Sequence, residues 1–76
     1  SVGGSNGSAD LFIALDQALD QLESVDDRLA RVVEYRFFGG MKEKEIAELL
    51  DISARTVRRD WRKAKLWLAR ALKEED

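Results

Sequence analysis

The sequence predicts an all-α protein, a compact four-helix domain that contains a helix-turn-helix. Three observations favour this fold: apolar residues recur at three- and four-residue steps, proline is absent, and helix-forming residues dominate after Ser8. With 76 residues, the chain has the length of one domain. A domain of this size buries only about 60% of the surface of its unfolded chain, so we expect short, closely packed helices.

The first eight residues, SVGGSNGS, differ in composition from the rest. They comprise three glycines, three serines, one asparagine and a single apolar residue. Such a segment buries too little apolar surface to offset the entropy of ordering itself. We therefore predict a flexible linker, or a remnant of cloning, over residues 1–8 and a single helix-turn-helix domain over residues 9–76.

The first predicted helix covers Leu11–Ser24, with Asp10 placed to cap it. Its apolar residues share one face, which we expect to pack on a core. These residues are Leu11, Leu15, Ala18, Leu19 and Leu22.

The second predicted helix covers Asp27–Phe38, with Asp26 or Asp27 as its cap. Gly39 and Gly40 follow an aromatic pair and end the helix. The residues predicted to face inward are Leu29, Val32, Val33 and Phe37, with Phe38 left open.

Two further helices complete the prediction, over Lys42–Leu50 and Ala54–Lys73. The first of these is barely over two turns, so tertiary packing must hold it. Its apolar residues are Ile46, Ala47, Leu49 and Leu50. Asp51 and Ile52 form a tight connection, and Ser53 is placed to cap the last helix.

Residue types absent from the chain exclude most enzyme chemistry. There is no Cys and no His, which removes thiolate and imidazole metal sites and the usual ways of activating a nucleophile. We therefore predict that the protein is not an enzyme and that it has no cofactor and no metal site. Apolar runs are too short to cross a membrane, and we expect a cytoplasmic protein without a membrane partner.

The charge is unevenly distributed along the chain. The net charge is −2, but 8 of the 13 basic residues lie from Ile52 onward, against 4 of the 15 acidic residues. A basic surface on an otherwise acidic domain can still bind phosphates, because the charge at the contact surface, and not the net charge, determines the attraction.

The last predicted helix separates apolar and basic residues onto opposite faces. On a wheel of about 100° per residue, Trp61, Ala64 and Leu68 lie within about 40° of Val57. The arginines lie roughly 100° to 200° away and gather in the first turns after a tight connection, where a recognition helix meets the major groove. They are Arg55, Arg58, Arg59 and Arg62.

Arginine suits this task because its planar fork can donate two hydrogen bonds to guanine or to a phosphate. The amino end of the helix, with Ser53, can hold a phosphate as well. Thr56 either contacts the DNA or is only a first-turn residue. We expect Trp61 to pack in the core and Asp60 to form a surface ion pair with a neighbour such as Lys63.

Leu66 and Trp67 fall off the apolar stripe of the last helix. Either they cover the first helix, or they leave an apolar patch for a partner.

From Arg31 onward the sequence resembles the carboxy-terminal DNA-binding region, region four, of bacterial sigma factors of the extracytoplasmic-function group. The resemblance covers nearly all of the chain after residue 8. It lies in Arg36, Phe37, Phe38 and Gly40, in the EIA sequence Glu45–Ala47, in Leu50, Ile52 and Ser53, in Thr56 and Val57, and in Ala64 followed by Leu68.

The resemblance implies that the last helix reads the −35 promoter element in double-stranded DNA, and that an apolar surface rests on the flap of the RNA polymerase β subunit. An anti-sigma factor is a further partner of such domains. By position, the DNA contacts would be Arg55, Thr56, Arg58, Arg59 and Arg62, with Lys42 and Lys44 on phosphates. The sigma region that melts the −10 element is missing, so we expect an excised domain.

Two positions depart from the family pattern. Lys42 replaces the usual Ser or Thr, which removes a helix cap worth about 1 kcal/mol, and Asp51 replaces the usual Gly in the turn.

Two other interpretations remain: the output domain of a response regulator, which shares the EIA sequence and the Ser-to-Thr-Val spacing, and a helical protein-interaction module whose basic helix binds an acidic protein. The aromatic pair before Gly39 and the position of Trp61 favour a sigma factor.

Overall fold

A computed structural model describes residues 3–74, with side chains from Ala9 to Lys73. Four α-helices follow one another: α1 (Gly3–Val25), α2 (Asp27–Val33), α3 (Glu43–Leu50) and α4 (Ala54–Glu74). A π-helical turn, η1 (Glu34–Phe38), extends α2. No strand occurs in residues 3–74, and the predicted all-α fold with a helix-turn-helix is confirmed.

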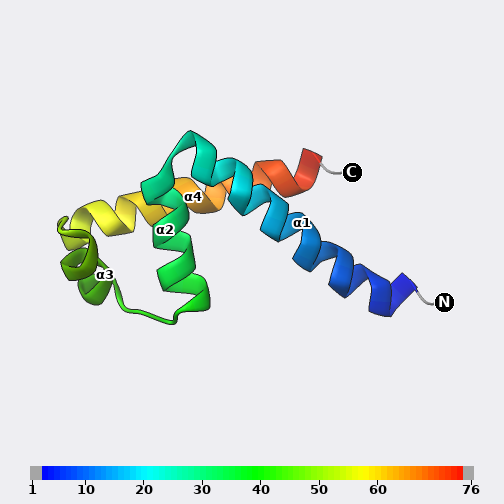
Figure 1. Ribbon diagram of the computed structural model, residues 1–76, viewed down its shortest axis with the longest axis horizontal. Helices are drawn as coiled ribbons and strands as arrows, with labels where there is room; N and C mark the ends of the chain where they lie inside the picture. Colours follow the sequence, from blue (N-terminus) through cyan, green and yellow to red (C-terminus); the bar gives the residue numbers. More distant parts are fainter. Residues whose placement is uncertain (1–2, 75–76) are drawn as a thin grey trace.

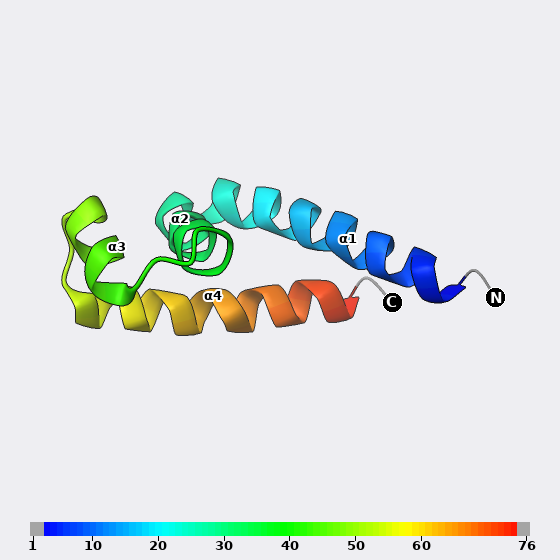
Figure 2. The ribbon, with the colours of Figure 1, turned by 90° about the horizontal axis from the view of Figure 1, so that it is seen from below.

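The two long helices, α1 and α4, run in opposite directions and approach each other along part of their length (Figures 1 and 2). The short α2 lies across α4, and α3 lies beside the amino-terminal end of α4. The two ends of the described chain are therefore at the same end of the molecule, and α3 is at the other (Figure 2). This arrangement leaves the first turns of α4 away from α1.

Two apolar clusters hold these helices. The first joins α1, α2 and α4 and contains Ala18, Leu19, Leu22, Leu29, Ala30, Val33, Ala64 and Leu68. The second joins α2, α3 and α4 and contains Val32, Ile46, Ala47 and Val57. Trp61 is half-buried and packs against both clusters, as its place on the apolar stripe predicts. The orientation of α4 therefore depends on contacts with α2 along both clusters.

The amino end of α1 differs from the prediction. The helix begins at Gly3, so residues 3–8 continue it in place of the predicted linker, and Asp10 lies inside it instead of capping it. Adding residues to an existing helix costs far less than starting one, which explains how Gly and Ser extend it. Leu11, predicted to face the core, is 60% exposed because α1 continues beyond the reach of α4. Ser1 and Val2 lie outside the described residues.

The second helix begins as predicted, with the Asp26 carboxylate accepting a hydrogen bond from the Leu29 N–H. The inward orientation predicted for Phe37 was wrong, and Phe38, left open, also faces outward: they are 61% and 50% exposed and stack edge-to-face at 5.0 Å. Because η1 has wider turns than an α-helix, the two rings are rotated away from the core. The helix ends at Gly39, where a Cβ would lie 2.8 Å from the carbonyl oxygen of Tyr35.

The third helix begins at Glu43, with Lys42 in the capping position but without a side-chain cap. The Glu45 carboxylate accepts a hydrogen bond from the Lys42 N–H at 2.8 Å, which satisfies one of the backbone donors at this end. Leu49, one of the four apolar residues named for this helix, is 56% exposed. Asp51 ends the helix in the left-handed region, at φ 57° and ψ 47°, where the family pattern has glycine.

Candidate nucleic-acid interface

The turn between α3 and α4 consists of three residues, Asp51–Ser53. The left-handed Asp51 reverses the chain, and the half-buried Ile52 packs against the second cluster. Ser53 then caps α4, since its hydroxyl accepts a hydrogen bond from the Thr56 N–H at 3.0 Å and lies 2.9 Å from the Thr56 hydroxyl. The predicted cap is therefore present, and the N–H groups of Ala54 and Arg55 remain free of intrahelical partners by helix geometry.

The side chains predicted to contact DNA gather on one face of α4. Arg55, Arg58, Arg59 and Arg62 are exposed, and Thr56 is half-buried. These five side chains together line a surface depression of about 260 Å³. On the opposite face Val57, Asp60 and Ala64 are almost completely buried. The separation of a basic face from a buried face, predicted from the helical wheel, is present in the structure.

One of the four arginines has a carboxylate partner. Arg58 donates from Nε and Nη2 to one oxygen of Glu43, at 3.3 and 3.2 Å. Because the Arg58 side chain is 56% exposed, such an ion pair contributes only about 0–1 kcal/mol, and a phosphate or a base edge can replace the carboxylate. Among the described side chains, Arg55, Arg59 and Arg62 form no ion pair.

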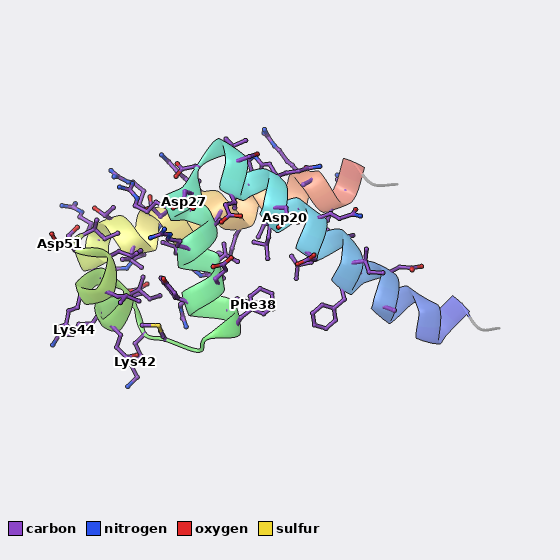
Figure 3. All side chains as sticks on the ribbon, viewed as in Figure 1. Asp20, Asp27, Phe38, Lys42, Lys44 and Asp51 are labelled. Atoms are coloured by element: carbon purple, nitrogen blue, oxygen red, sulfur yellow. The ribbon has the colours of Figure 1, made fainter. Side chains whose placement is uncertain are left out.

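Lys42 and Lys44 flank Glu43 at the amino end of α3. In Figure 3 their side chains point away from the ribbon, at the end of α3 opposite Asp51. They do not line the depression formed by the arginines. The Glu43–Arg58 pair nevertheless joins this end of α3 to the second turn of α4. Ser53, the remaining predicted contact, lies at the amino end of that face.

Asp60 is the predicted residue whose environment differs most from the prediction. It is 1% exposed, and its partner is Arg28 at the start of α2, not a surface neighbour such as Lys63. The guanidinium Nε and Nη2 donate to separate carboxylate oxygens at 2.7 and 3.3 Å. The helical wheel contained the signal for this burial, because Asp60 lies only about 60° from Val57.

The tryptophans differ in their surroundings. The Trp61 ring lies 5.4 Å from the Lys65 ammonium nitrogen and 6.0 Å from the Arg36 guanidinium carbon, both within cation–π range. Trp67 is half-buried against the first cluster, which includes residues of α1. Of the two alternatives for this residue, this packing favours the one in which it covers the first helix. Leu66 is 65% exposed and, with Trp67, Lys63 and Arg70, lines a separate surface hollow.

A larger, apolar hollow lies on the side of α4 that faces α1 and η1. It measures about 370 Å³ and is lined mainly by carbon atoms. Its lining residues are Leu15, Val33, Phe37, Trp61, Lys65, Leu68, Ala69 and Leu72. Phe37, exposed by η1, also lines a smaller adjoining hollow with Leu11, Phe12 and Leu15. The two hollows form one apolar surface that we call the α1–α4 groove.

Other kinds of site find no support within the described part of the chain. No group of three or more His, Cys, Asp or Glu residues there is placed to hold a metal ion. No helix in the same residues is both long enough and apolar enough to cross a membrane.

A short α3, a three-residue turn and an α4 with an exposed basic face at its amino end together define a helix-turn-helix DNA-binding domain. The family model described as "ECF sigma factor" matches residues 3–74. The chain therefore belongs to the ECF sigma factor family, whose members act in transcription initiation, and its helices correspond to region four. Searches among curated proteins and among solved structures returned no match.

Proposed function

We propose that α4 of this sigma factor binds the −35 element of its promoters and so directs RNA polymerase to the start of transcription. One observation supports this most strongly: the five side chains from Arg55 to Arg62 that share a depression lie at the amino end of α4, opposite a buried face. A response-regulator output domain shares the helix-turn-helix, but the family match favours a sigma factor.

The contacts follow from the chemistry of these side chains. A guanidinium can donate two parallel hydrogen bonds to O6 and N7 of guanine, which gives base discrimination of about 1–3 kcal/mol for each well-placed pair. We assign this role to Arg55, Arg58, Arg59 and Arg62, with Thr56 on a thymine methyl or a phosphate. Ser53 with the first-turn N–H groups of α4, and Lys42 and Lys44 of α3, hold backbone phosphates.

The α1–α4 groove offers a surface for a protein partner. Its apolar lining and exposed Phe37 suit an amphipathic segment, and we assign it to the flap of the RNA polymerase β subunit. An anti-sigma factor that covers the same groove or the arginine face would inhibit the domain. Since chromosome and polymerase share the bacterial cytoplasm, we propose that the protein acts there.

Selection of bound duplexes from a random pool tests the proposal. We expect enrichment of one asymmetric sequence bound by a single chain. With about three phosphates held, by Lys42, Lys44 and the amino end of α4, affinity for that duplex should fall about 40-fold when monovalent salt rises from about 50 to about 200 mM. A two-fold symmetric site bound by a dimer would favour the response-regulator function. Weak, salt-insensitive binding without enrichment would favour the protein-interaction module.

A further inference from the structure

The Arg28–Asp60 pair lies directly behind the arginine face. Asp60 follows Arg58 and Arg59 in the chain, but its side chain points to the opposite side of α4 and is 2% exposed. It is the one charged residue in the buried core of the described chain. Arg28 reaches it from the first turn of α2, with about half of its side chain still exposed.

The two hydrogen bonds between Arg28 and Asp60 are directional, unlike the apolar contacts around them. Around them, α2 and α4 meet through aliphatic side chains such as Val32, Val33 and Val57. Apolar contacts are non-directional, so they tolerate a small rotation of one helix against another. Two charge-assisted bonds from one guanidinium to both oxygens of Asp60 have a fixed geometry and oppose that rotation.

A small rotation of α4 would matter at the DNA. A side-chain tip lies about 6 Å from the axis of its helix, so a turn of about 20° moves it by about 2 Å. Hydrogen bonds to base edges tolerate much less than this displacement. Contacts to phosphates tolerate more, because a long side chain can reach a charge from several directions.

An ion pair with a buried carboxylate is a weak source of stability, because removing that charge from water offsets much of the attraction. A well-packed apolar pair often stabilises a protein as much or more. The burial of the Asp60 charge therefore calls for a role other than stability.

We propose that Arg28 and Asp60 are positioning residues, which fix the rotation of α4 and so set the base selectivity of the arginine face. This inference rests on the proposed binding of duplex DNA by α4. The pair contacts no DNA itself. Its loss should reduce discrimination between DNA sequences while leaving electrostatic, sequence-independent binding unchanged.

The test compares two double variants that each replace one ion pair. Arg28→Met with Asp60→Leu removes the buried pair and leaves the net charge unchanged. Arg31→Met with Asp27→Leu is the matched control, since it removes an exposed pair of the same residue types at 2.9 Å within α2. For each protein, affinity is measured for the duplex enriched by selection and for a scrambled duplex, and thermal unfolding is followed by circular dichroism.

In the Arg28–Asp60 double variant we expect discrimination between the two duplexes to fall at least about tenfold, with an unchanged affinity for the scrambled duplex and a melting temperature at or above that of the wild type. The control should keep full discrimination. Arg28→Lys, which keeps the charge but loses the two-point geometry, provides a milder variant that does not depend on repacking the core. It should lose about threefold in discrimination.

Full discrimination in a folded Arg28→Lys variant and in a folded double variant would overturn the inference and leave the proposed function standing. An equal loss of affinity for the selected and the scrambled duplex would also overturn the inference, since that pattern indicates general damage to the fold. A wild-type protein without any sequence preference would instead contradict the proposed function, and with it the inference.

Discussion

Reversing the charge of Arg58 (Arg58→Glu) should weaken binding of the selected duplex by about 100-fold or more. A lost bidentate contact accounts for about 1–3 kcal/mol, where 1.4 kcal/mol is a factor of ten, and the new carboxylate also repels phosphates. The new side chain faces Glu43, but that site is exposed and the added repulsion should cost the fold little. Fluorescence anisotropy of labelled duplex measures the affinity, and circular dichroism verifies the helices.

Arg70→Glu is the matched control, because Arg70 is an exposed arginine on the same helix. It lies twelve residues beyond Arg58, about 18 Å along the helix axis, and does not line the depression. The control should bind the duplex nearly as well as the wild type. Equal losses in both variants would show that only the general charge of α4 matters, and unchanged binding by Arg58→Glu would remove this side chain from the interface.

Replacing Trp61 by alanine should destabilise the domain by about 3 kcal/mol and lower its melting temperature by more than about 12 °C. Trp61 packs against both apolar clusters. Its removal therefore takes away apolar contacts from the cluster that holds α1 and from the cluster that holds α3. A domain of this length has only a few kcal/mol of stability, so the variant should be substantially unfolded at moderate temperature. Thermal unfolding followed by circular dichroism measures the loss.

Trp67→Ala is the control for the loss of an indole ring. Trp67 packs against the first cluster alone, and we expect a loss of about 1 kcal/mol. If both variants melted at the same temperature, the bridging role of Trp61 would be wrong.

The helix-turn-helix could be predicted from the sequence because its signals are local. The apolar spacing around Val57 and the placement of Ser53 depend on helix period and on capping chemistry, and both are present in the structure. The exposed arginines follow from the same period. These features need no knowledge of which helix packs on which.

Contacts between distant segments could not be predicted in the same way. The partner of Asp60 is 32 residues away, and nothing in the spacing of the chain selects Arg28 over the nearby Lys63. The exposure of Phe37 depends on the π-helical turn, which rotates the aromatic pair relative to the α-helical period. Leu11 fits the apolar stripe of α1, but the stripe continues past the end of the packed interface.

Duplex DNA should contact the arginine face of α4. This contact can be mapped by following backbone and arginine side-chain NMR signals during titration with the selected duplex. We expect the largest changes at the amino end of α4, from Ser53 to Arg62, with smaller ones at Lys42 and Lys44 and none at Leu15 and Phe37, which line the α1–α4 groove away from that end. Changes confined to the groove, with the arginine signals unmoved, would contradict this prediction.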